Sequence, residues 1–296
     1  MLEHQPVMVA EVVAQLVPER GGCFVDCTVG AGGHSRRLLE AGATRLIGLD
    51  RDRDALAVAE VSLKAWASQV ELVHADFRDL GELLRTRHIE AIDGIVADLG
   101  ISSMQVDAEG RGFSFRRDEP LDMRMDQTSG PDARALLATC GERELADVIY
   151  RYGEERHSRR IARAIVATRA RAPIETTGQL ASIVRRAMPG ARGRIDPATR
   201  TFQAVRIWVN RELEGLDGFL REAVSWLRPH GRLVVIAFHS LEDRIVKQTL
   251  RQLATEAPRQ LVLLTKRPLV PSDEEIGRNP RARSAKLRAA ERMTHE

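Results

Sequence analysis

Short apolar runs alternate with helical patterns along the first hundred residues of the chain. The runs predicted to be strands are 23–25, 46–49, 70–73 and 92–96, and the segments with helical spacing between them are 35–41, 54–68 and 80–86. Strand–helix alternation of this kind predicts a parallel sheet with right-handed crossovers.

The alternation stops near residue 107. From there to residue 210 helical periodicity dominates, with no convincing strand. Strands return at 232–238 and 260–265, and 284–290 is a weaker candidate. The pattern therefore predicts one α/β domain, residues 1–107 and 211–296, which is interrupted by a helical insertion at 108–210.

Composition places the chain among cytoplasmic globular proteins. It has 296 residues, of which 43% are hydrophobic and 29% charged. No apolar run approaches the 18 or more residues of a membrane span, and the N-terminus lacks the basic start of a signal peptide. Three cysteines, Cys23, Cys27 and Cys140, are too few for a disulfide framework or a zinc site, so we expect core thiols and no metal.

The charge of the chain is carried mostly by arginine. Net charge is +3 and the pI is near 9.0, yet there are only four lysines, Lys64, Lys247, Lys266 and Lys286. The planar arginine side chain suits phosphate and nucleic-acid bases. Genome composition explains a high arginine content equally well, so the position of the arginines, clustered in the middle third, matters more than their number.

Candidate binding residues stand where the predicted strands end. Three glycines, Gly30, Gly32 and Gly33, follow the first strand and precede a helix, which suits close approach of a ligand to the backbone. The second strand ends at Asp50, where an acid can hold a ribose diol. The third is followed by Asp76 and Phe77, which suit an adenine, and the fourth ends at Asp98. The carboxyl ends of parallel strands share one edge, so we expect these residues to lie together.

Three residues at these strand ends also have an alternative interpretation in which they do not bind a ligand. Asp50 could be the N-cap of the helix that follows it. Phe77 could belong to the core, and His34, just after the glycines, could be a solvated residue of the first helical turn.

The spacing of the glycines helps to distinguish between two possible cofactors, NAD and S-adenosylmethionine. A dinucleotide such as NAD would fit a glycine turn followed by an acid, but Gly30-x-Gly32-Gly33 is not G-x-G-x-x-G. Asp26 precedes the glycines, where a carboxylate would oppose a pyrophosphate but would suit the ammonium of a methionine moiety. The pattern is therefore similar to that of class I S-adenosylmethionine-dependent methyltransferases, with a Rossmann-like sheet.

Longer motifs narrow the resemblance. The segments DLGISSMQ, RGFSF, PLDMRMD, YGEERHSRRIARAI, ATRTFQAVRIWVN, GRLVVIAFHSLEDRIVK and NPRARSAKLR, with His4-x-Pro6-Val7, run over nearly the whole chain. Together they resemble the ribosomal small-subunit methyltransferase H family. The resemblance implies N4-methylation of one cytidine of 16S rRNA at the decoding centre, near the P site, on a largely assembled small subunit. It also implies a methyltransferase domain with an inserted helical domain that recognises the substrate.

The same resemblance implies the cofactor-binding residues. For S-adenosylmethionine they are Gly32, Gly33, His34, Asp50, Phe77, Asp98 and Gln105. The Pro-Pro-aromatic motif of many amino-methylating enzymes is replaced here by Asp98-Leu99-Gly100-Ile101. By position, Asp98 and the Leu99 carbonyl are the candidates to accept the hydrogens of the target amine, and Asp98 is the candidate catalytic residue.

Contacts with RNA are expected from the insertion. The candidates are Arg159, Arg160, Arg163, Arg200, Arg206 and Asn210, within a larger group that also includes Arg156, Arg185, Arg186, Arg192 and Arg194. For any one of them a solvated helix face is an equal alternative. A helix over 202–210 could present Arg206 and Asn210 to the active site while its apolar residues pack. At the end of the fifth strand, His239 could accept a proton or make a structural hydrogen bond, and the second is favoured.

Three functions remain open on these grounds. The first is an RNA cytidine-N4 methyltransferase acting on 16S rRNA. The second is a methyltransferase of DNA or of a small molecule, and the third is a non-catalytic assembly factor that binds RNA and uses the cofactor structurally. The sequence does not predict the oligomeric state.

Overall fold

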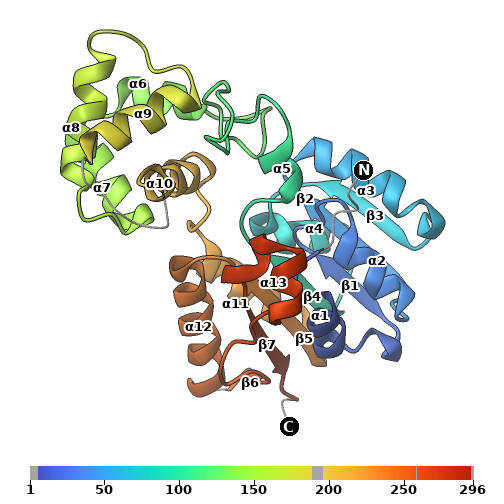
Figure 1. Cartoon of the computed structure of the whole chain (residues 1–296). Helices are drawn as coiled ribbons and strands as arrows, with labels where there is room; N and C mark the ends of the chain where they lie inside the picture. The colour runs from blue at the N-terminus through green and yellow to red at the C-terminus, as the bar shows by residue number, and fades with distance from the viewer. Residues whose placement is uncertain (1–5, 189–195, 258, 295–296) are drawn as a thin grey trace. The chain divides into compact units, whose positions relative to one another are not determined.

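A computed structural model describes residues 6–188, 196–257 and 259–294 (Figure 1). His4, Arg192 and Arg194, which were named above, lie outside these residues. The chain divides into two compact units, the first made of Met1–Gly100 with Leu213–Glu296 and the second of Ile101–Glu212. The predicted insertion, 108–210, falls within the second unit.

The first unit is built on a seven-stranded sheet with the order β3-β2-β1-β4-β5-β7-β6. Its strands are β1 (Cys23–Asp26), β2 (Arg45–Asp50), β3 (Val70–His74), β4 (Ile92–Asp98), β5 (Leu227–Ala237), β6 (Leu261–Leu263) and β7 (Lys286–Arg292). Strands β1 to β5 pair in parallel, whereas β7 is antiparallel to both β5 and β6. The predicted Rossmann-like sheet of a class I methyltransferase is thus confirmed.

One strand differs clearly from its prediction. The sequence places the start of β5 at Arg232, but the strand begins at Leu227, which pairs with Ile92 before the register shifts. The residues between, Arg228 to His230, are exposed, so they carry no apolar pattern that could reveal a strand. His230 also has a positive φ of 64°, an irregularity that hydrophobic periodicity does not predict.

Helices cover both faces of this sheet. They are α1 (Val9–Leu16), α2 (Gly33–Glu40), α3 (Arg53–Ser62), α4 (Leu80–Thr86), α11 (Leu216–Trp226), α12 (Ser240–Thr255) and α13 (Asp273–Arg278), with short 3₁₀ turns at Pro18–Arg20, Lys64–Trp66, Phe77–Asp79 and Pro280–Ser284. Neighbouring residues of β1 face opposite sides: Phe24 packs with α1 and α2, and Val25 packs with α4 and α11. Burial on both faces explains why the parallel strands read as continuous apolar runs.

The second unit is helical in its described part, as the sequence predicts. Its helices are α5 (Ser103–Asp107), α6 (Ala133–Thr139), α7 (Glu142–Gly153), α8 (Ser158–Arg169), α9 (Thr177–Ala187) and α10 (Ala198–Asn210), and one isolated bridge joins Pro120 to Thr176. They enclose a separate core that includes Leu145, Ile161 and Val184. In the part of the chain that the structure describes, no helix is both long and apolar enough to cross a membrane.

Asn210, at the end of α10, ties a long irregular segment to this core. Its side chain is 2% exposed. The amide nitrogen donates to the carbonyls of Met123 (2.7 Å) and Arg206 (2.9 Å), and the amide oxygen accepts from the Met125 N–H (2.7 Å). These bonds satisfy backbone groups of a segment that has few helical or strand partners of its own.

Replacing Asn210 with Ala should lower the free energy of unfolding by about 2–4 kcal/mol, because two buried backbone groups lose their partners. Urea denaturation followed by circular dichroism measures this change. Thr199→Ala, an exposed position on the same helix, is the matched control and should change stability by less than about 0.5 kcal/mol. Equal stability of the Asn210 variant and the wild type would show that the amide does not hold the segment.

Candidate active site

The carboxyl ends of the first four strands bring three acids to one edge of the sheet. Asp26 ends β1, Asp50 ends β2 and Asp98 ends β4. The glycine turn between β1 and α2 lies at the same edge, with positive φ at Gly30 (52°) and Gly32 (85°). Such angles favour glycine, and they let the turn approach a ligand closely.

Asp50 holds this glycine turn in place. Its two oxygens accept from the N–H groups of Gly30 (2.8 Å) and Asp52 (2.9 Å). Burial raises the pKa of Asp50 to about 6, although these two hydrogen bonds oppose the shift. The N-cap of α3 is Asp52, whose side chain accepts from the Asp54 N–H, so Asp50 is not the cap of this helix.

His34 and Asp98 face one another beside the turn. His34 Nε2 lies 3.4 Å from Asp98 Oδ2, and His34 is only 5% exposed, so its interpretation as a solvated residue is wrong. Burial lowers the pKa of His34, but the carboxylates of Asp98 and Asp26 outweigh this effect and the net pKa is raised. Among the described residues, Asp98 Oδ1 and both ring nitrogens of His34 are buried without a hydrogen-bond partner.

Asp26 does not have the role that its sequence position suggested. It is completely buried, and it accepts hydrogen bonds from the Ser35 hydroxyl (2.7 Å) and the Thr28 N–H (3.2 Å). Desolvation raises the pKa of this carboxyl. A group with no exposed surface cannot touch a ligand's ammonium. Asp26 instead supports the glycine turn through its hydrogen bonds with Ser35 and Thr28.

The side chains of the residues after β3 already contact other residues of the protein. Phe77 is half-buried, and its ring lies 4.8 Å from that of Phe219. The Asp76 carboxylate forms a two-point ion pair with Arg78 (2.8 and 2.7 Å). This pairing makes Asp76 a poorer acceptor for an adenine amine than its position suggested. The Arg78 guanidinium also lies over the Phe77 ring, 5.8 Å from its centroid.

Residues near the start of the described chain pack on the glycine turn and are bonded to α13, which the sequence did not predict. Pro6 lies so close to Gly33 that a Cβ at Gly33 would come within 2.8 Å of Pro6 Cγ. Met8, with φ of 54°, donates its N–H to Glu275 Oε1 of α13 at 2.7 Å. The two residues are 267 positions apart, so no local pattern could reveal the contact.

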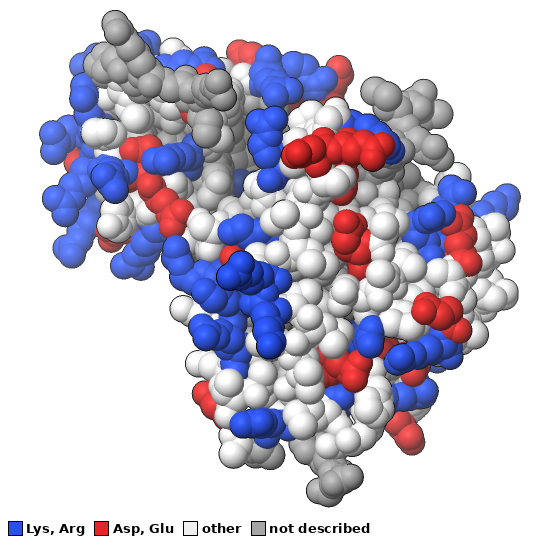
Figure 2. All heavy atoms as spheres, turned by 60° about the horizontal axis from the view of Figure 1, so that its bottom comes forward, with Lys and Arg blue, Asp and Glu red and all other residues white. Residues whose placement is uncertain are grey.

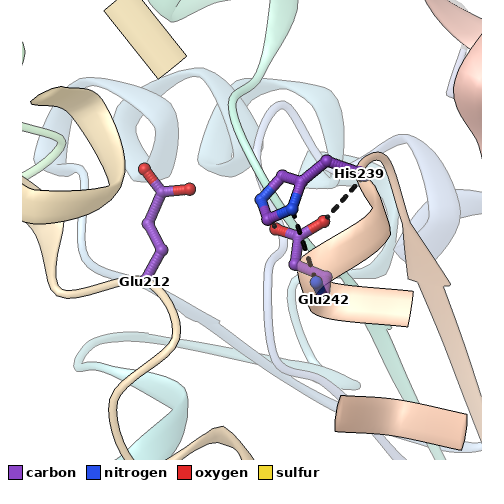
Figure 3. A group of neighbouring side chains, drawn as sticks. All are labelled: Glu212, His239 and Glu242. Carbon is purple, nitrogen blue, oxygen red and sulfur yellow. Dashed lines mark hydrogen bonds and ion pairs between the residues drawn. The ribbon is translucent and has the colours of Figure 1, made fainter. Parts of the chain in front are cut away.

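His239 and Glu242 form a capping box at the start of α12 (Figure 3). The Glu242 carboxylate accepts from the N–H groups of Phe238 (2.9 Å) and His239 (3.4 Å), and His239 Nδ1 accepts from the Glu242 N–H (3.4 Å). This agrees with the structural role that we favoured for His239. Glu212, also drawn in Figure 3, ends the second unit, where it pairs with Arg206 (2.8 Å).

The remaining predicted residues belong to the second unit. Gln105 is 5% exposed and caps α5, accepting from the Ser102 N–H (3.1 Å). Arg206, only slightly exposed, forms a two-point ion pair with Glu212. Together with the burial of Asn210, this corrects the expectation that α10 presents these two side chains to a substrate: both hold the unit together.

The arginines of α8 are different. Arg159, Arg160 and Arg163 are all exposed, and Arg163 makes a loose ion pair with Glu142 at 3.6 Å. Arg200 is exposed as well and lies 3.6 Å from the buried Glu155. Figure 2 shows Lys and Arg side chains crowding the surface of this unit at the left edge of the view. These four residues can therefore reach an external phosphate.

Comparison with known proteins places this geometry in a family. Residues 1–293 match the MraW methylase family. A protein of Bradyrhizobium diazoefficiens named ribosomal RNA small subunit methyltransferase H is 51% identical over 304 residues, covering 98% of this chain and 92% of that protein. The protein of the same name from Thermomicrobium roseum is 48% identical, covering 99% and 94%. The chain therefore belongs to the MraW methylase family of S-adenosylmethionine-dependent methyltransferases.

Proposed function

We propose that the protein transfers the methyl group of S-adenosylmethionine to the N4 amine of one cytidine in 16S rRNA, at the decoding centre of the small ribosomal subunit near the P site. The observation that carries the proposal is the pair formed by His34 and Asp98. His34 Nε2 lies 3.4 Å from Asp98 Oδ2, while His34 Nδ1 and Asp98 Oδ1 are buried without a hydrogen-bond partner among the described residues, beside a glycine turn at the sheet edge.

The residues of this edge fit the cofactor. Each oxygen of Asp50 accepts one N–H and keeps a lone pair with which to accept from a ribose hydroxyl. The N-cap of α2, Gly32, provides no side-chain cap, so N–H groups of the first turn are available to the methionine carboxylate. Phe77, an aromatic residue that is only partly buried, suits an adenine ring. When bound, the cofactor supplies an electrophilic methyl group on a sulfonium.

We infer that Asp98 and Leu99 act on the amine. The N4 lone pair of cytosine is delocalised into the ring, so an acceptor for the amine hydrogens would raise its reactivity. Asp98 is anchored through its N–H to the Thr28 hydroxyl (2.6 Å), while its Oδ1 has no hydrogen-bond partner among the described residues. We assign to Asp98 the role of accepting an amine hydrogen as positive charge develops, with the Leu99 carbonyl beside it.

The choice of substrate rests on the second unit and on the relatives. The curated relatives are named for the RNA of the small ribosomal subunit. The exposed arginines of α8 are suited to contact phosphates, which position a nucleic acid without reading its sequence. The cytidine must leave any base stack to reach a buried sulfonium.

A methyl-transfer assay with tritiated cofactor tests the proposal. We expect label to enter small subunits at one cytidine, and to enter neither DNA nor small-molecule amines. Absence of transfer to subunits and to naked 16S rRNA alike would exclude the function.

Cofactor affinity should depend on the ionisation of Asp50. Because the pKa of this carboxyl is about 6 and only its ionised form accepts both ribose hydroxyls, affinity should be constant above pH 7 and fall toward tenfold per unit well below pH 6. Asp50→Asn should bind about 2–3 kcal/mol more weakly at pH 7 and should no longer show this pH dependence. Calorimetry at a series of pH values measures both effects.

The matched control is Glu60→Gln, an exposed acid on α3 that should leave affinity and its pH dependence unchanged. An Asp50→Asn protein that retained the wild-type pH dependence would assign the titration to another group, such as His34.

Asp98→Asn should lower kcat by about 100-fold, with a smaller decrease in cofactor affinity, because the carboxylate interacts most strongly when the amine becomes positive. Single-turnover kinetics with saturating cofactor and small subunits separates the two effects. Near-normal turnover with only weaker cofactor binding would show that Asp98 binds the cofactor and does not polarise the amine.

Replacing Arg159, Arg160 and Arg163 with Gln should weaken RNA binding and reduce its log–log salt slope by about 0.7–0.9 for each phosphate that the variant no longer neutralises. Filter binding of 16S rRNA at several salt concentrations gives the slope. Affinity for the cofactor should be unchanged, because none of these residues is a candidate cofactor residue. A salt slope equal to that of the wild type would show that these three arginines form a solvated helix face and do not contact RNA.

A further inference from the structure

The segment 244–267 concentrates positive charge within the first unit. It contains one acid, Glu256, and six cations, which are Arg244, Lys247, Arg251, Arg259, Lys266 and Arg267, so its net charge is +5. The first unit as a whole has 25 Lys or Arg and 27 Asp or Glu, a net charge of −2. Without this segment the unit would carry −7. The entire second unit, with 20 cations and 15 acids, also carries +5.

The charges on α12 form a single stripe. Arg244, Lys247 and Arg251 are spaced i, i+3 and i+7, which places them on one face of the helix, and all three are exposed. The opposite face packs into the core through Val246 and Leu250. With a rise of about 1.5 Å per residue the stripe is roughly 10 Å long, enough to meet more than one phosphate of a nucleic-acid strand.

The acids at the start of α12 point away from this stripe. Glu242 is buried and bonds to the backbone at the end of β5. Asp243 binds Arg288 (2.7 Å) and Lys286 (3.4 Å) of β7, and these cations lower the pKa of Asp243 against the raising effect of its burial. The helix therefore carries its own carboxylates on the side of the sheet and its cations on the side of the solvent.

Two more cations follow the strand against which α12 packs, β6. Lys266 and Arg267, both exposed, follow β6, the outermost strand, and precede the bridge between Leu269 and Leu287. The candidate cofactor residues lie at the other half of the sheet, on β1, β2 and β4. A polyanion bound along α12 and β6 would therefore not compete with the cofactor.

We propose that α12 and the edge beyond β6 form a second phosphate-binding face, which holds the backbone of rRNA on the methyltransferase unit itself. This rests on the function proposed above and adds to the arginines of the insertion. The face combines flexible lysines with arginines, and two of the four lysines of the chain, Lys247 and Lys266, belong to it. Such a surface is suited to neutralise phosphates and not to read bases.

The test compares two triple variants of the full chain. The first variant replaces Lys247, Arg251 and Arg267 with Gln. The control variant replaces Arg20, Arg53 and Lys64 with Gln. These three residues are also exposed, and the control therefore loses one lysine and two arginines, as the first variant does, but from the first hundred residues of the same unit. Affinity for naked 16S rRNA is measured between low and moderate salt. We expect only the face variant to bind more weakly and to show a log–log salt slope smaller by about two units, at about 0.7–0.9 per phosphate.

Melting temperature and cofactor affinity, measured on the same proteins, should match the wild type. If the triple variant is unstable, the single charge reversal Lys247→Glu replaces it and should lower RNA affinity at low salt. An unchanged slope on naked rRNA overturns the proposal. Weaker binding seen with small subunits but not with naked rRNA also overturns it, because the face would then bind a ribosomal protein.

If the proposed methyltransferase function is wrong, the outcome differs from the one that overturns this phosphate-binding face. In that case the wild-type protein transfers no methyl group to small subunits, while the salt slopes of the variants still decide whether this face binds RNA.

Discussion

Complete burial of the Asp26 carboxylate is the constraint on which the glycine turn, at the carboxyl edge of the sheet, depends. A carboxylate without water needs hydrogen-bond donors from the protein, and the Ser35 hydroxyl and the Thr28 N–H supply them. Those donors lie on either side of the glycine turn, so satisfying Asp26 fixes where the turn begins and where α2 starts. Asp50 then fixes the middle of the turn through the Gly30 N–H. The geometry presented to a ligand is thus set by acids that the ligand need not touch.

The contrast between Asp26 and Asp98 explains how similar residues at one edge divide their tasks. The polar atoms of Asp26 are bonded within the protein, which makes it structural. Asp98 has a buried oxygen, Oδ1, without such a partner in the described residues, and His34, which faces its other oxygen, has a ring nitrogen, Nδ1, that also lacks one. Leaving buried polar atoms unpaired costs stability, and it is justified where a ligand completes the bonds. Hydrogen-bonding capacity that a ligand could use is therefore left at the pair, while the oxygens of Asp26 and Asp50 are bonded within the protein.

The sequence predicted the strands of the first hundred residues because parallel strands buried on both faces leave apolar runs that are easy to recognise. It also located the edge residues, because the order of strands brings their ends together. The sequence did not distinguish residues that contact a substrate from residues of the same type that hold the protein together. Asn210 and Arg206 look like surface contacts in the sequence, yet their partners, Met123 and Glu212, bury them. The pairing of Asp76 with Arg78 was within reach, since the two are only two residues apart. The contact between Met8 and Glu275 was not.

That last contact has a consequence for the order in which the protein is made. Glu275 leaves the ribosome 267 positions after its partner Met8. Until α13 has been synthesised, the segment that packs beside Gly33 lacks this anchor, so in a nascent chain the glycine turn is not yet fully supported even after the first four strands exist. The proposed cofactor site would thus be completed only late in translation, after the whole second unit has been synthesised.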